Sequence, residues 1–196
     1  MQILPVKRAL ISVTHKDGLA KLARFLDEKG VEIVSTGGTA RLLQEQGIAV
    51  TRVSDVTGFP EILGGRVKTL HPHIHAGILA DKDDPDHSGT MKELGINFFD
   101  LVCVNLYDFA RAVADDADAR EAVEKIDIGG PALLRASAKN FHSVCVLPDP
   151  GFYDPFMEMV QKKDGVDLAF RQETAAYTFE MTSSYDQMIS RYLRKK

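Results

Sequence analysis

Short apolar runs alternate with helix-like stretches over the first three quarters of the sequence, and this alternation constrains the fold more than any other feature. The runs are rich in Val, Ile and Leu, as the buried strands of parallel sheets are. Between them, residues such as Leu19, Leu22 and Leu26 recur at helical spacing. Strand and helix in regular alternation predict an α/β fold, a parallel five-stranded sheet between helix layers. The predicted strands are Lys7–Val13, Val31–Val34, Ile48–Val53, Phe99–Val104 and Ser143–Leu147.

The last quarter of the chain has a different pattern. From Pro150 onward the apolar spacing is helical only, and we interpret this part as a C-terminal helical appendix folded onto the same core. A chain of 196 residues is long enough for one sizeable domain and short for two. We therefore expect residues 1–196 to form a single three-layer domain.

Charge and cysteine content limit the partners and the compartment. A net charge of −4 gives no support for a nucleic-acid or anionic-membrane partner. No apolar run approaches the roughly 20 residues that span a bilayer, and Met1 to Arg8 lacks the order of a signal peptide. Cys103 and Cys145 lie in apolar runs, where we expect two buried, reduced thiols. These features predict a cytoplasmic protein.

One segment breaks the alternation. Between Ser54 and Ala80 the chain contains four glycines and two prolines, and such an insert in a compact domain is more often a functional loop than slack chain. Arg66 and Lys68 lie two positions apart, so in an extended loop they point the same way and suit an anionic substrate. The alternative is a solvated basic loop.

Three histidines in the same segment alternate along the chain. His71, His73 and His75 could ligate a metal, but carboxylates and cysteines at ligand-like spacing are absent around them. We therefore expect no metal.

Two glycine-containing turns follow the first two predicted strands. Ligands of open parallel sheets bind beyond the carboxyl ends of the strands, where turns into helices expose backbone N–H groups. The turns are Ser12–Gly18 (SVTHKDG) and Ser35–Thr39 (STGGT), and Lys16 adds a cation to the first. Together they favour phosphate binding. Taken singly, each turn is a weak signal of phosphate binding and is better explained as a helix-capping turn.

Two further motifs fall on the same predicted face. Asn105 and Tyr107 follow the fourth strand directly, although Tyr107 could instead be an ordinary half-buried aromatic residue. The string IDIGGPALLRASAKN places Asp127 before a helix that starts near Pro131. Lys139 lies about 12 Å farther along a straight helix at 1.5 Å per residue, so it shares a site with Asp127 only if that helix is short or bent, or if the lysine side chain reaches back.

Taken together, these strings resemble a known family. SVTHKDG, STGGTA, TGFPEILGGRVKTLHPHIHAGILA, VNLY and IDIGGPALLRASAKN, in this order, are similar to the IMP cyclohydrolase domain of the bifunctional purine-biosynthesis proteins. The resemblance covers about Lys7 to Tyr192. It implies the methylglyoxal-synthase-like fold and the dehydrative ring closure of 5-formamidoimidazole-4-carboxamide ribonucleotide to IMP, the last step of de novo purine biosynthesis.

The resemblance also implies roles for residues at matching positions. It implies no cofactor, because ring closure moves protons and expels water. The residues implied in substrate binding are Ser12, Thr14, Lys16, Thr36, Gly37, Gly38, Thr39, Arg66, Thr69, Asn105, Gly129 and Gly130. The residues implied in catalysis are Lys68, Tyr107, Asp127 and Lys139.

Within this set we assign chemical roles as a hypothesis. Asp127 acts as the base for the amide nitrogen, while Lys68 and Tyr107 donate to the formyl oxygen as charge builds. Lys139 protonates the departing hydroxide and forms a proton-handling pair with Asp127.

The sequence departs from the family in several places. Family members usually read SVSDKTG where this chain has Thr14, His15 and Asp17, so a ligand role for Thr14 requires its hydroxyl to replace that of serine. They usually have proline at Asp108 and often histidine at Phe141. The sequence stops at Lys196 without the transformylase domain that normally follows, and a natural single-function enzyme and an excised domain are both compatible with that. A separate transformylase and a homodimer are possible partners.

Two other functions remain open at this stage. A methylglyoxal synthase shares the fold and binds phosphate, but the GGRVKTLHP and AKN strings are not expected of it. A regulatory ligand-binding module, as this fold forms in carbamoyl-phosphate synthetase, needs no acid–base set. Fold alone does not decide between these functions.

Overall fold

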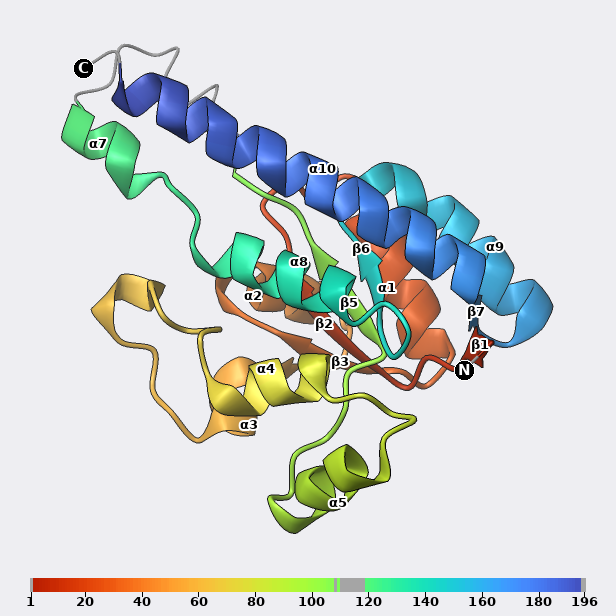
Figure 1. Ribbon diagram of the computed structural model, residues 1–196. Coiled ribbons are helices and arrows are strands. Elements are labelled where there is room, and N and C mark those ends of the chain that lie inside the picture. The colour runs from red at the N-terminus through yellow and green to blue at the C-terminus, as the bar shows by residue number, and fades with distance from the viewer. Residues whose placement is uncertain (1, 108, 110–118, 195–196) are drawn as a thin grey trace.

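Five strands form one parallel sheet in the computed structural model, which describes residues 2–107, 109 and 119–194. The strand order is β4-β3-β2-β5-β6, and Figure 1 shows α10 lying along α8 over this sheet. The strands are β1 (Ile3–Leu4), β2 (Arg8–Ser12), β3 (Glu32–Ser35), β4 (Thr51–Arg52), β5 (Leu101–Val104), β6 (Cys145–Leu147) and β7 (Val166–Asp167). The helices are α1 (Leu19–Glu28), α2 (Gly37–Glu45), α3 (Val53–Thr57), η1 (Leu63–Gly65), α4 (Pro72–Leu79), α5 (Pro85–Glu93), α7 (Ala119–Glu124), α8 (Gly129–Lys139), η2 (Pro150–Phe152), α9 (Tyr153–Lys163) and α10 (Leu168–Leu193).

The sheet separates two apolar cores, because successive side chains of a strand point to opposite faces. Ala9 and Ile11 of β2 enter one core with residues of α1 and α9. Leu10 enters the other core, which α4, α8 and α10 complete. The predicted three-layer α/β arrangement is therefore confirmed. Cys103 and Cys145 are buried and not disulfide-bonded, as the apolar runs around them indicated.

The third strand is shorter than predicted. Only Thr51 and Arg52 pair with β3 at the edge of the sheet, and the next residue, Val53, begins α3. Ile48 belongs to the turn that ends α2, where its N–H donates to the carbonyl oxygen of Leu43 at 3.1 Å. Its apolar side chain is buried by this turn and not by strand pairing.

The glycine-rich segment is not one loop, and the prediction was wrong in this respect. The eight-residue helix α4 occupies its second half. Pro72 stands in the first turn, and His71 caps the helix by accepting the His73 N–H. Ile74 and Ile78, one turn apart, are both buried. The apolar i, i+4 spacing therefore indicates a helix in this part of the segment, although the segment contains glycines.

The last quarter is mostly helical, as predicted, with one exception. The short strand β7 pairs antiparallel with β1, so Leu4 lies beside Val166. These two-residue strands are too short to show a pattern in the sequence. Asp108 lies outside the described residues. Within the part of the chain that the structure describes, no helix is long and apolar enough to cross a membrane.

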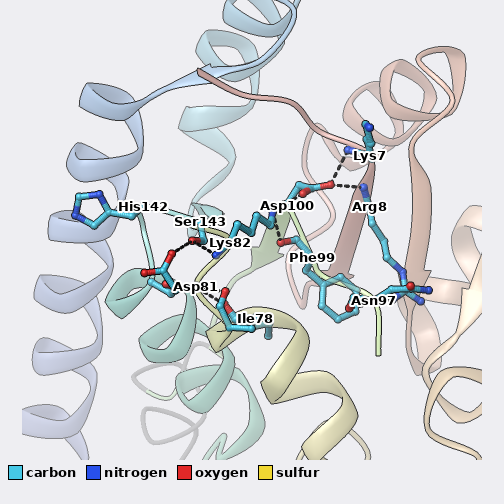
Figure 2. A network of polar contacts seen from close by, with 12 residues as sticks. Lys7, Arg8, Ile78, Asp81, Lys82, Asn97, Phe99, Asp100, His142 and Ser143 are labelled. Carbon is cyan, nitrogen blue, oxygen red and sulfur yellow. Dashed lines mark hydrogen bonds and ion pairs between the residues drawn. The ribbon is translucent and has the colours of Figure 1, made fainter. Parts of the chain in front are cut away.

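A buried charge network closes the amino edge of the sheet (Figure 2). The Asp100 carboxylate accepts the backbone N–H groups of Lys7 and Arg8 at 2.7 and 2.8 Å and pairs with the Lys82 ammonium. Lys82 also donates to the Phe99 carbonyl oxygen at 3.0 Å. Burial lowers the pKa of Lys82, and the charge of Asp100 opposes that shift. The starts of β2 and β5 are thus held together by one carboxylate.

Replacing Asp100 with alanine is expected to lower the free energy of unfolding by about 3–5 kcal/mol, because Lys82 keeps a buried charge and loses its partner. The control is Asp154→Ala, which removes an ion pair with Lys21 whose side chains are 66% and 69% exposed. That change is expected to cost at most about 1 kcal/mol. Urea unfolding of both variants measures the difference, and equal losses would contradict the central role given to Asp100.

Candidate active site

A cavity of about 760 Å³ lies beyond the carboxyl ends of β2, β3 and β5. β2 pairs with β3 on one side and with β5 on the other. Strands β3 and β4 are therefore added on one side of β2 and strands β5 and β6 on the other, so the strand order reverses at β2. Such a reversal is where open parallel sheets bind ligands. Predicted site residues that line the cavity are Ser12, Thr14, Lys16, Thr36, Gly38, Thr39, Arg66, Lys68, Thr69, Asn105, Tyr107, Asp127, Gly129 and Gly130.

Asn105 holds the turn after β2 in place. Its side-chain oxygen accepts the N–H groups of Thr14 and His15 at 2.6 and 3.1 Å. Its amide nitrogen donates to the His15 carbonyl oxygen at 3.0 Å. Most of the hydrogen-bonding capacity of Asn105 is therefore spent on the protein. Asn105 lies in the predicted site, and these contacts shape the turn after β2.

Lys16 projects from the same turn toward α2. Its ammonium donates to the Thr39 hydroxyl at 2.8 Å and to the Val13 carbonyl oxygen. Burial lowers the pKa of Lys16, and the nearby charge of Lys68 lowers it further. Two cations held close together create a positive potential that favours an anion between them.

The start of α2 provides backbone donors at the same place. Thr36 precedes the helix without capping it through its side chain, and its hydroxyl instead lies 3.4 Å from that of Ser12. Gly37 has a φ of +49°, and a Cβ there would stand 3.0 Å from the Lys68 Nζ atom. Glycine thus allows the lysine to lie against the helix start. Gly37 lines an adjoining cavity of about 580 Å³ that shares Thr36, Gly38 and Lys68.

Asp127 faces this cationic group from the opposite wall. One of its carboxylate oxygens accepts the Gly130 N–H at 2.8 Å. Burial raises the pKa of Asp127, while that hydrogen bond and the charge of Lys68 act against the shift. Asp127 follows α7 and precedes α8. Asp127 therefore lies before a helix, as predicted, and at a junction between two helices.

Arg66 and Lys68 do not point the same way, because residues 66–69 form a turn and not an extended loop. Arg66 is ion-paired with Glu124 at the exposed rim of the cavity. Lys68 is half-buried and lies over Gly37. The next residue, Thr69, is buried, and its hydroxyl would stand 2.7 Å from a Cβ at Gly129. Residues 66–69 therefore contact the first residues of both α2 and α8, through Lys68 and Thr69.

Of the predicted catalytic residues, Tyr107 lines the cavity and Lys139 does not. Tyr107 is 49% exposed and lines the cavity. Lys139 is exposed at the far end of α8, which runs without interruption from Gly129, and it is not among the cavity-lining residues. The structure of this chain therefore does not bring Lys139 together with Asp127. Its acid–base role stays a prediction that the resemblance alone carries.

The three histidines lie at and within α4. His71 caps the helix, the His73 ring lies 3.3 Å from the Val56 carbonyl oxygen, and burial lowers the pKa of His75. Among the described residues, no three His, Cys, Asp or Glu side chains are grouped so that they could hold a metal ion.

Several cavity residues had no signal in the sequence. Glu124 and Lys125 reach the wall from the end of α7, a segment without any motif. Tyr185 of α10 contacts the site from behind, since its hydroxyl accepts the Asp127 N–H at 2.8 Å. Only the fold reveals these neighbours, because nothing local in the sequence marks them.

Comparison with known proteins agrees with this architecture. The MGS-like domain family matches residues 18–132, and the chain belongs to that family. A second family, the AICARFT/IMPCHase bienzyme, matches residues 137–196. The crystal structure of ForH superposes with a TM-score of 0.82 at 35% identity, covering 94% of this chain and 97% of that one.

Curated relatives extend the second match over nearly the whole chain. The bifunctional purine biosynthesis protein PurH of Clostridium acetobutylicum is 53% identical over 188 residues, which is 96% of this chain. PurH of Mycobacterium marinum is 50% identical over 190 residues, or 97% of this chain. The chain spans only 38% and 36% of the lengths of these two relatives.

Substituting Lys68 with methionine is expected to raise the pKa of the Asp127 carboxyl group further above its ordinary value. The reason is that the change removes a positive charge that favours the carboxylate. Carbon-13 NMR titration of the aspartate side chains measures this shift. Lys163→Met, which breaks a remote ion pair with Asp167, is the control and should leave the pKa of Asp127 unchanged. An unchanged value in the Lys68 variant would contradict their proximity.

Proposed function

We propose that this chain is an IMP cyclohydrolase that closes 5-formamidoimidazole-4-carboxamide ribonucleotide to IMP, the last step of de novo purine biosynthesis. The observation that carries the proposal is that Lys68, Tyr107 and Asp127 line one cavity together with residues of the turns after β2 and β3. The names of the PurH relatives and of the bienzyme family support it.

The 5′-phosphate of the substrate binds at the turns after β2 and β3. Lys16 supplies charge there, and the uncapped start of α2 supplies backbone N–H donors. The base portion then extends toward Asp127 and the start of α8, along the wall that Lys68 and Thr69 form between the two helix starts. This orientation places the reacting end of the substrate away from the phosphate.

Ring closure joins two groups of the same molecule. The carboxamide nitrogen attacks the formyl carbon, and the enzyme must hold the reactive rotamer while charge develops on the formyl oxygen. Lys68 and Tyr107 donate hydrogen bonds to that oxygen. Asp127 accepts the proton that the carboxamide nitrogen loses and returns it to the formyl oxygen. A second proton, from the formamido N–H, lets that oxygen leave as water and completes the ring. Burial of Asp127 suits this role, because a raised pKa makes a carboxylate a stronger base.

The reaction has no redox step and transfers no external group, so we propose that it needs no cofactor. The PurH relatives are named as bifunctional, and we propose that a transformylase, separate from residues 1–196, supplies the formylated substrate. A cytoplasmic location and a homodimer stay predictions.

The purified chain is expected to convert the formamido ribonucleotide to IMP without added metal, folate or nucleotide, as followed by absorbance. Asp127→Asn should lower kcat by about 10²–10⁴-fold, the typical contribution of a general base, and leave IMP affinity nearly unchanged. Because the pKa of Asp127 is raised, wild-type activity should fall on the acid side as the base is protonated. Asp154→Asn, which changes an exposed acid on α9, should behave as wild type.

Binding of IMP without turnover of the formamido ribonucleotide would contradict the proposal and favour a regulatory module. Activity that is lost on chelation and restored by zinc would contradict the metal-free mechanism.

Lys16→Ala is expected mainly to raise KM, because a phosphate contact exists in both the ground state and the transition state. Lys21→Ala on the exposed face of α1 is the matched control, since it removes a cation that pairs with Asp154 away from the cavity. Calorimetry should show that inosine, which lacks the phosphate, binds much more weakly than IMP. Equal affinities would rule out this placement of the phosphate.

A further inference from the structure

Tyr185 connects the C-terminal helix to the turn that carries Asp127. It lies on α10 and is 4% exposed. Its hydroxyl oxygen accepts the backbone N–H of Asp127 at 2.8 Å, across 58 positions of sequence. A buried N–H without a partner costs free energy, so this hydrogen bond favours one position of the turn.

The residues on either side of Asp127 have their own contacts: Ile126 packs against the core, and the Ile128 carbonyl oxygen accepts the Ala132 N–H at 3.2 Å. The Asp127 carboxylate accepts the Gly130 N–H at 2.8 Å, which ties the side chain to the start of the helix. Ile128 precedes α8 without capping it through its side chain and is 61% exposed. The Tyr185 hydroxyl therefore fixes the backbone of Asp127 from the side opposite to the cavity. With the hydroxyl removed, the Asp127 N–H loses this partner, and we expect the backbone and the carboxylate of Asp127 to shift together.

The tyrosine ring is held independently of its hydroxyl. It packs edge-on against Phe109, with ring centroids 6.4 Å apart. Tyr192, two helical turns farther along α10, packs on the same phenylalanine at 5.6 Å. Among the described residues, the buried Tyr192 hydroxyl has no hydrogen-bond partner. The two tyrosines thus share a helix and a ring contact, and they differ in whether the hydroxyl reaches the catalytic turn.

We propose that Tyr185 is a positioning residue for the ring-closing reaction, whose hydroxyl sets the distance between the Asp127 carboxylate and the carboxamide nitrogen of the substrate. This inference rests on the proposed cyclohydrolase function. It makes α10 part of the active-site architecture although none of its residues lines the cavity. Phosphate binding is expected not to depend on Tyr185, because its hydroxyl contacts the Asp127 turn and not the turns after β2 and β3.

The test compares Tyr185→Phe with Tyr192→Phe, since each variant loses one hydroxyl and keeps its ring. Tyr185→Phe is expected to lower kcat roughly tenfold, the effect of losing one hydrogen bond that orients a reacting group, while KM stays within about twofold. Tyr192→Phe should match wild type in both constants. Thermal unfolding of both variants shows whether each retains the fold at the assay temperature.

A double-mutant cycle separates positioning from general stability. If Tyr185 acts through Asp127, then Tyr185→Phe should cause almost no further loss in an Asp127→Asn background. A tenfold loss in both backgrounds, or a Tyr185→Phe enzyme equal to wild type, would overturn the inference. A wild-type chain that forms no IMP would instead overturn the proposed function, and the inference with it.

Discussion

The parallel pairing of β2 with both β3 and β5 is the constraint on which the rest of the structure depends. It places the reversal of strand order at the centre of the sheet, so the turns after these strands diverge and leave a cavity. At the opposite edge, the starts of β2 and β5 are held together by Asp100, which pairs with Lys82. One edge of the sheet is thus closed by buried charge, and the other remains available to a ligand.

The electrostatics of the cavity follow from how its charges are distributed. Arg66 and Glu124 neutralise each other at the rim, where solvent screens them. Farther inside, the described lining residues include two cations, Lys16 and Lys68, and the half-buried carboxylate of Asp127. The cations favour an anionic substrate and at the same time oppose the effect of burial on the Asp127 pKa. Substrate attraction and the strength of the base are therefore coupled through Lys68.

The sequence predicted the features that depend on local pattern. Buried strands leave apolar runs, and residues just after parallel strands meet at one edge, so most of the predicted site residues do line one cavity. Predictions failed where contacts between distant parts of the chain determine the local structure. Ile48 was predicted to be in a strand but lies in the turn that follows α2. The glycine-rich segment was predicted to be a loop but contains α4. Arg66 pairs with Glu124, whereas Lys68 lies over Gly37, because residues 66–69 form a turn. The spacing of the two residues alone does not indicate that turn.

The C-terminal helix illustrates why some functional residues escape sequence reasoning. Its apolar spacing predicts only burial, and Tyr185 does fill the core beside α8. A tyrosine, however, carries a polar atom at the end of an apolar ring, and its burial obliges that atom to find a partner. The partner here is the backbone of Asp127, far away in sequence. Packing of α10 on the sheet and alignment of the Asp127 turn are thus consequences of the same buried side chain.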